Sequence, residues 1–124
     1  MFDERQSRIL AALETVRAPA QPGEYDLHAL VSAALARAGI DAVHEYRLAP
    51  RCRIDFLCGT IGIEVKKGRP DRRALLAQLS RYLGHDALTG IVVVTQRAVA
   101  LPPHIAGKCV HLVSLNRLWG VALP

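Results

Sequence analysis

The stretch that decides the fold runs from residue 53 to residue 68 and reads RIDFLCGTIGIEVKKG. Two apolar runs flank Gly59-Thr60, and this pattern predicts a β-hairpin with glycine at the first central position of a type II′ turn. A two-residue loop fixes the register of the two strands. The expected pairs are Cys58 with Ile61, Leu57 with Gly62, Phe56 with Ile63, Asp55 with Glu64 and Arg53 with Lys66.

Side chains on a strand alternate between its two faces, so the same register sorts the hairpin into an apolar and a polar face. The apolar face, expected to be core, holds Ile54, Phe56, Cys58, Ile61, Ile63 and Val65. The other face holds Arg53, Asp55, Leu57, Gly62, Glu64 and Lys66. The Cβ atoms of Asp55 and Glu64 would then lie about 5 Å apart. Two like charges at that distance repel by about 3 kcal/mol at an effective dielectric constant of about 20.

This repulsion calls for a positive partner. Lys66 lies two residues from Glu64 on the same strand, and a divalent cation held by both carboxylates would offset more of the repulsion. Gly62 is expected to leave space beside them. The face therefore resembles a hard-metal site with a lysine at its rim, suited to metal-assisted hydrolysis of a phosphodiester. The alternative is an ordinary cross-strand charge cluster on an exposed hairpin.

Outside the hairpin, the apolar periodicity predicts three helices and three further strands. Helices are expected at residues 3–17, at residues 27–38 with Gly39 as the cap, and at residues 71–85. Strands are expected at residues 42–48, 52–58, 61–67, 90–96 and 109–115, with a loop at 100–104 and a tail at 116–124 that holds Trp119. The order of helices and strands predicts an α/β fold with a mixed sheet flanked by helices.

The chain has 124 residues, of which 51% are apolar and 22% charged, and this composition predicts one globular domain over residues 1–124. Residues 1–20 would form an N-terminal helix and linker, and residues 24–115 the core. No apolar run approaches the roughly 20 residues that cross a bilayer, and the N-terminus lacks a signal-peptide pattern, so we expect a soluble, cytoplasmic protein. Three cysteines without paired spacing are expected to be reduced and half-buried.

The formal net charge is +5, and most of the excess lies between residues 51 and 73. That segment holds seven basic and three acidic residues. Such a concentration fits either a phosphate-binding surface or a solvated basic face. The charge leaves both open.

Asp55, followed after eight residues by Glu64-Val-Lys66, resembles the PD-(D/E)XK nuclease superfamily, in which an Asp and a Glu-X-Lys on adjacent strands bind Mg²⁺. Ile54 stands where the superfamily's nominal proline would be. The order of elements over residues 24–115 is also similar to that superfamily's core. The resemblance implies a restriction endonuclease-like core of helix, three strands, helix and two strands, with an extra N-terminal helix.

Two further features carry the resemblance. Gln78-Leu-Ser-Arg-Tyr82 is similar to the Gln-x-x-x-Tyr of the nuclease domains of recombination helicase-nucleases, where those side chains approach the site and the DNA backbone; simple packing is the alternative for Tyr82. Many members also have a metal-binding glutamate on the first core helix. Glu24 matches that position, because it lies three residues before Leu27, and Glu45 is its rival.

The resemblance thus implies a small Mg²⁺- or Mn²⁺-dependent nuclease acting on DNA, with structure-selective or nicking activity, and it leaves a homodimer open. Asp55, Glu64 and Glu24 would hold the metal, and Lys66 would position the attacking water. The residues expected at the nucleic-acid backbone are Gln78, Tyr82, Lys67, Arg69, Arg72 and Arg73. The alternatives are a catalytically inactive nucleic-acid-binding module and a partner-binding protein. The five histidines are scattered without a ligand motif and are expected to be surface or half-buried residues.

Overall fold

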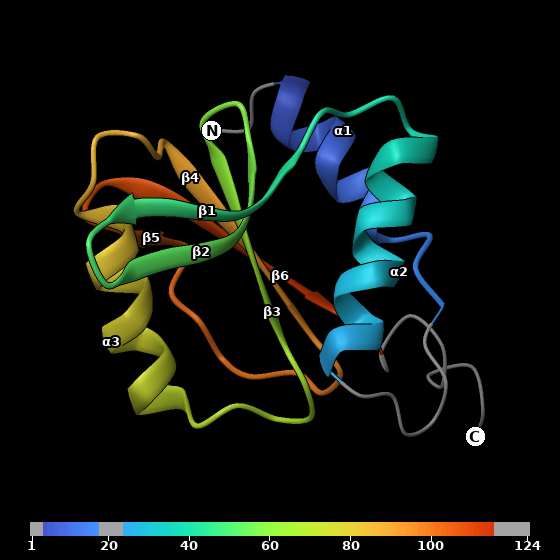
Figure 1. The fold of residues 1–124 in the computed structure, drawn as a ribbon. Helices are drawn as coiled ribbons and strands as arrows, with labels where there is room; N and C mark the ends of the chain where they lie inside the picture. Colours follow the sequence, from blue (N-terminus) through green and yellow to red (C-terminus); the bar gives the residue numbers. More distant parts are fainter. Residues whose placement is uncertain (1–3, 18–23, 116–124) are drawn as a thin grey trace.

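The computed structural model describes residues 4–17 and 24–115, except for the side chains of Glu24 and Tyr25 (Figure 1). The described helices are α1 (Glu4–Leu13), α2 (Glu24–Arg37) and α3 (Arg72–Leu83). The described strands are β1 (Val43–Ala49), β2 (Cys52–Cys58), β3 (Ile61–Lys66), β4 (Gly90–Thr95), β5 (His104–Ile105) and β6 (Lys108–Ser114). The linker at 18–23 and the tail with Trp119 lie outside these residues.

The six described strands form one mixed sheet in the order β1-β2-β3-β4-β6-β5. β1, β2 and β3 are antiparallel neighbours, whereas β3, β4 and β6 run parallel, with α3 as the crossover between β3 and β4. The prediction of an α/β fold with a mixed sheet flanked by helices is confirmed. β5 begins inside the predicted loop at 100–104, and two residues are too short to give a strand pattern.

Helices α1 and α2 cover one face of the sheet and α3 covers the other (Figure 1). The sheet-facing stripe of α2 is buried, as its periodicity predicted, with Val31 fully excluded from solvent. β4 is buried on both faces, because Val92 and Val94 pack toward α1 and α2 while Ile91 and Val93 pack toward α3. An uninterrupted apolar strand is what such a position requires.

The predicted register of the β2–β3 hairpin is confirmed next to its turn. The ladder pairs Cys58 with Ile61, Leu57 with Gly62 and Phe56 with Ile63. Gly59 has a φ of +64° and Thr60 does not have a positive φ, which fits the expected type II′ turn. The ladder ends at Phe56 and Ile63, so the predicted backbone pairs of Asp55 with Glu64 and of Arg53 with Lys66 do not form.

The predicted alternation of β2 is wrong at one point. Phe56 belongs to the core under α1 and α2, but Ile54 belongs to the core under α3. At the same level of β1, Glu45 adopts a left-handed φ of +55°, and His44 and Tyr46 on either side of it also face different layers. Both strands therefore change face where β2 leaves β3.

The change of face also corrects the expectation that Gly62 leaves space beside the acidic residues. A Cβ atom on Gly62 would collide with Ile54 Cδ1 and would lie 3.3 Å from Leu88 Cδ2. The volume over Gly62 is therefore filled by apolar side chains of the α3 layer. Glycine is required here by close packing and not by a metal or a substrate.

Candidate functional site

Glu64 is a buried carboxylate of the candidate site, with 3% of its surface exposed. Its Oε2 lies 3.3 Å from Lys66 Nζ and 3.3 Å from the hydroxyl of Tyr82. Its Oε1 accepts a hydrogen bond of 3.4 Å from the backbone N–H of Asp55. A buried carboxylate needs such partners, because an isolated charge in the interior is strongly unfavourable.

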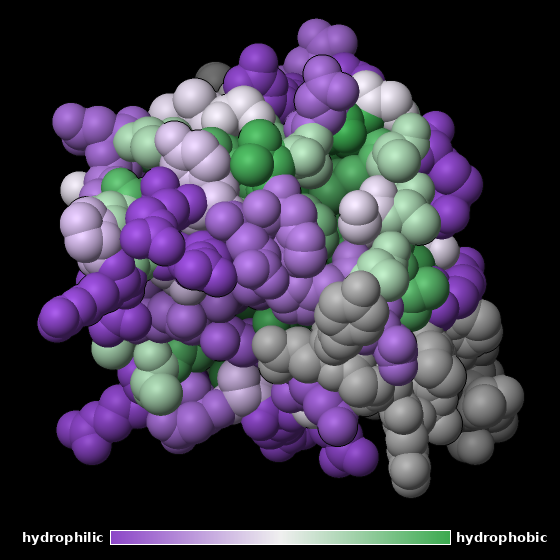
Figure 2. All heavy atoms as spheres, viewed as in Figure 1, coloured by the Kyte–Doolittle hydropathy of each residue, from purple (hydrophilic) through white to green (hydrophobic). Residues whose placement is uncertain are grey.

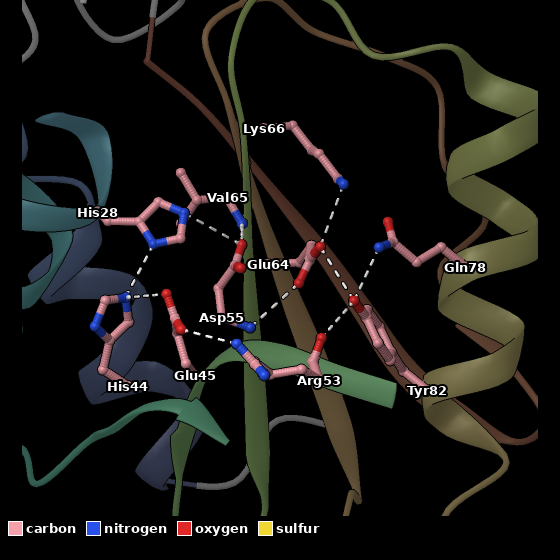
Figure 3. Close-up of polar contacts among 10 residues, drawn as sticks. All are labelled: His28, His44, Glu45, Arg53, Asp55, Glu64, Val65, Lys66, Gln78 and Tyr82. Atoms are coloured by element: carbon pink, nitrogen blue, oxygen red, sulfur yellow. Dashed lines mark hydrogen bonds and ion pairs between the residues drawn. The ribbon is translucent and has the colours of Figure 1, made fainter. Parts of the chain in front are cut away.

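Asp55 lies at the point where the β2–β3 ladder stops, and its side chain replaces a backbone partner. Its Oδ2 accepts a 2.7 Å hydrogen bond from the backbone N–H of Val65. The same oxygen lies 3.6 Å from Nε2 of His28 on α2. Asp55 and Glu64 thus meet in one gap of the ladder, but Asp55 reaches toward α2 and Glu64 toward α3 (Figure 3).

The surroundings of Glu64 disfavour its negative charge. Burial and, next, the nearby charge of Asp55 raise the pKa of Glu64 to about 7, although Lys66 and the hydrogen bond from Asp55 oppose that rise. Lys66 therefore only partly offsets the effects of burial and of Asp55 on the charge of Glu64. With a pKa of about 7, Glu64 would have both its protonated and its ionised form populated near neutral pH.

Tyr82 and Gln78 of α3 brace Glu64. Gln78 Nε2 donates to the Tyr82 hydroxyl oxygen at 2.9 Å, and the single hydroxyl proton is shared between the Arg53 carbonyl at 2.9 Å and Glu64 Oε2 at 3.3 Å. Burial and the charge of Glu64 raise the pKa of Tyr82, so its hydroxyl stays protonated. Tyr82 is 3% exposed, which places it against Glu64 and not at the surface where a nucleic acid would lie.

His28 was missed by sequence reasoning. It is buried, and its Nδ1 lies 3.0 Å from Nε2 of His44, whose ring stacks on Phe56 with centroids 4.7 Å apart. The signal was present in the helix: His28 lies three residues before Val31 and seven before Leu35, on the stripe that faces the sheet. His28 was not singled out, because the five histidines form no ligand motif in the sequence.

A shallow groove adjoins the Glu64 side of the site. It has a volume of about 400 Å³ and is lined by Lys66, Lys67, Pro70, Asp71, Ala74, Leu75 and Gln78. Lys66 is partly exposed at this groove, while its Nζ reaches inward to Glu64. Two residues of the groove thus also belong to the surroundings of Glu64, because Lys66 contacts its carboxylate and Gln78 contacts Tyr82.

The other basic residues expected at a nucleic acid are exposed around the start of α3. They are Lys67, Arg69, Arg72 and Arg73. Arg72 is tied down, because its Nε donates to the carbonyl of Ala100 at 2.7 Å. Lys67 lines the groove, and its neighbour Gly68 is anchored by a 2.6 Å hydrogen bond to the side chain of Gln96.

Glu24 and Glu45 were the two alternatives for a metal-binding glutamate beside Asp55 and Glu64. Glu24 is the first residue of α2, and its side chain lies outside the described residues. Glu45 is half exposed and pairs with Arg53 at 3.1 Å and with His44 at 3.9 Å. Within residues 4–17 and 24–115, no group of three His, Cys, Asp or Glu side chains is placed to hold a metal ion.

The three cysteines form no disulfide, and Cys52 and Cys58 are buried whereas Cys109 is half-buried. Burial raises the pKa of the Cys58 thiol to about 11.

None of the helices described here is long and apolar enough to cross a membrane.

Comparison with known proteins identifies no relative of this chain. No family model matches the chain, and neither the curated proteins nor the solved structures include a significant match. Any functional assignment therefore depends on the site's own residues and geometry.

Proposed function

We propose that this protein is a small metal-dependent nuclease of the PD-(D/E)XK type that hydrolyses phosphodiester bonds of DNA. The observation that carries the proposal is the gap between β2 and β3, where a 3% exposed Glu64 meets Asp55 and Lys66. An ordinary surface charge cluster would be solvated, and it would not raise the pKa of a glutamate to about 7. The order β1-β2-β3-β4, with α3 as the crossover, supports the restriction endonuclease-like core.

The residues present fit a hard divalent cation in part. Asp55 and Glu64 supply carboxylate oxygens, the ligands that Mg²⁺ and Mn²⁺ prefer, and the raised pKa of Glu64 means that Lys66 does not fully stabilise its charge. We assign these two carboxylates to the cation, with Glu24 as the further ligand that the described side chains do not supply. When bound, such an ion polarises a phosphoryl oxygen and lowers the pKa of water.

The protein's own groups have separate tasks in this proposal. The Lys66 ammonium, which is partly exposed beside Glu64, orients the attacking water and offsets charge that develops on the phosphate. Tyr82 and Gln78 hold the Glu64 carboxylate in place from α3. Lys67, Arg69 and Arg73 contact the nucleic-acid backbone, which predicts salt-dependent and largely sequence-independent binding.

The test is cleavage of supercoiled plasmid and of branched DNA with Mg²⁺ or Mn²⁺. Asp55→Asn and Lys66→Met should each slow cleavage by about 10² to 10⁴-fold. Arg37→Met, at the exposed end of α2, is the control, since it removes one positive charge away from Glu64 and from the basic residues assigned to DNA. Unchanged circular dichroism and thermal melting would show that the variants fold.

The second candidate is a nucleic-acid-binding module of the same fold that does not cleave. The basic residues around the groove favour binding independently of catalysis. Salt-sensitive DNA binding by the wild type, without cleavage under any metal condition, would establish this candidate and end the nuclease proposal. Absence of any DNA affinity at low salt would instead favour a partner-binding protein.

A further inference from the structure

Three arginines line a second groove at the far end of the β1–β2 hairpin. This groove has a volume of about 430 Å³ and is formed by Arg47, Arg51, Cys52 and Arg53. All three arginine side chains are exposed, and hydrophilic side chains gather over the side of the molecule where β1 and β2 lie (Figure 2). None of these arginines belongs to the groove beside Lys66.

The pairing of the two strands places like charges together. Arg47 and Arg53 are direct partners in the antiparallel ladder, an arrangement that is unfavourable unless an anion lies between the charges. Arg53 is paired with Glu45 at 3.1 Å. Among the described side chains, neither Arg47 nor Arg51 pairs with a carboxylate, so two positive charges stay unbalanced.

The turn adds a second, independent observation. Arg51 has a φ of +65° and follows Pro50, the combination of a type II turn in which glycine normally takes the second central position. A left-handed φ on a side chain of this size is unfavourable. The Arg51 side chain is exposed and makes no hydrogen bond or ion pair with any described group, so no such contact within the described residues explains why an arginine stands at this position.

We propose that this arginine groove binds the phosphodiester backbone of a nucleic acid, next to the phosphate that the candidate site would take. The inference rests on the proposed function for its ligand. Arg53 lies two residues, or about 7 Å of strand, from Asp55. Its carbonyl accepts the hydrogen bond from Tyr82. Guanidinium groups match phosphate oxygens in bidentate geometry. The groove therefore holds the strand on the β1–β2 side of the site, while Lys66, Lys67 and Gln78 hold it on the α3 side.

The test is fluorescence anisotropy of a labelled DNA duplex across a salt series, with chelator present so that no cleavage occurs. Arg47→Ala and Arg51→Gly should each weaken binding at least about threefold and reduce the slope of log K against log salt by about 0.9 for each phosphate that the variant no longer neutralises. Arg37→Ala, at the end of α2, removes the same charge and should bind like the wild type. Arg51→Gly should melt at the wild-type temperature or higher, because glycine tolerates that turn.

The outcomes separate this inference from the nuclease proposal. Arg47→Ala and Arg51→Gly binding no worse than Arg37→Ala would overturn the inference, even if the wild type cleaves DNA. Weakened binding by both variants would support it, even if no cleavage is ever seen. Release of the duplex by inorganic phosphate, beyond the effect of chloride at equal ionic strength, would reassign the groove to free phosphate and overturn the inference. Arginine-dependent binding to phosphatidylserine vesicles, without binding to the duplex, would also overturn it.

Discussion

Glu64 is a buried carboxylate whose charge state the surrounding protein controls. Its pKa is raised to about 7 in the folded protein, whereas in the unfolded chain it lies near its ordinary value of 4.5. The folded state therefore binds the extra proton between these values. Stability from this group is fully present below about pH 4.5 and is lost as pH rises through about 7.

We predict that Glu64→Gln removes this pH dependence. In chelator, the wild type should lose on the order of 1–3 kcal/mol of unfolding free energy relative to the variant between pH 5 and pH 8. Urea unfolding at several pH values measures the difference between the two curves. Glu45→Gln, a half-exposed control, should follow the wild type. Parallel curves for Glu64→Gln and the wild type would show that Glu64 is ionised at every pH tested.

Tyr82→Phe tests the brace on Glu64. Loss of the hydroxyl removes the side-chain donor to the Arg53 carbonyl and leaves Glu64 Oε2 with Lys66 alone, so we expect a loss of about 1–3 kcal/mol in urea unfolding. Tyr46→Phe is the matched control, because Tyr46 is half-buried in the same apolar layer and donates no described hydrogen bond. Equal costs for the two variants would contradict the role given to Tyr82.

At the level of the hairpin, the sequence predicted the turn and the three strand pairs next to it, but not the end of the ladder or the change of face. Period-two alternation assumes that both strands stay paired along their whole length. Here the side chain of Asp55 accepts a hydrogen bond from the backbone N–H of Val65, and the β2–β3 ladder ends. A strand propensity does not reveal such a competition between a side chain and the backbone. His28 was missed for a related reason, because its partner Asp55 comes from a different element.

The change of face makes a specific prediction about packing. Gly62→Ala should cost about 1–3 kcal/mol, because the new Cβ would meet Ile54 Cδ1. Ile54→Val removes that Cδ1 atom, so the double variant should recover part of the loss. A double-mutant cycle by urea unfolding measures the coupling between the two positions. Additive effects would mean that Ile54 does not lie over Gly62.

For the whole molecule, the order of helices and strands and the single mixed sheet followed from apolar periodicity, since the hairpin and the buried β4 have strong patterns. The arrangement of the charged groups between the two layers did not follow, because it depends on contacts between α2, β2, β3 and α3. Lys66 and Glu64 were expected as neighbours on β3, but the depth of Glu64 comes from packing of the complete sheet.

Metal binding should raise the melting temperature of the whole protein, because a ligand that binds only the folded state stabilises it. We expect Mn²⁺ to raise the melting temperature of the wild type more at pH 8 than at pH 6, because a proton and the cation compete for Glu64. Asp55→Asn should lose most of this response, and Glu45→Gln should keep it. The measurement is differential scanning fluorimetry with and without chelator. An equal rise in melting temperature at both pH values would show that Glu64 is not a ligand of the metal.

The left-handed kink at Glu45 has a consequence for the protein at high concentration. β1 is an outer strand of the sheet, and an outer strand offers unpaired N–H and C=O groups to other molecules. The kink interrupts that row near its middle and breaks the flat template on which copies could stack into fibrils.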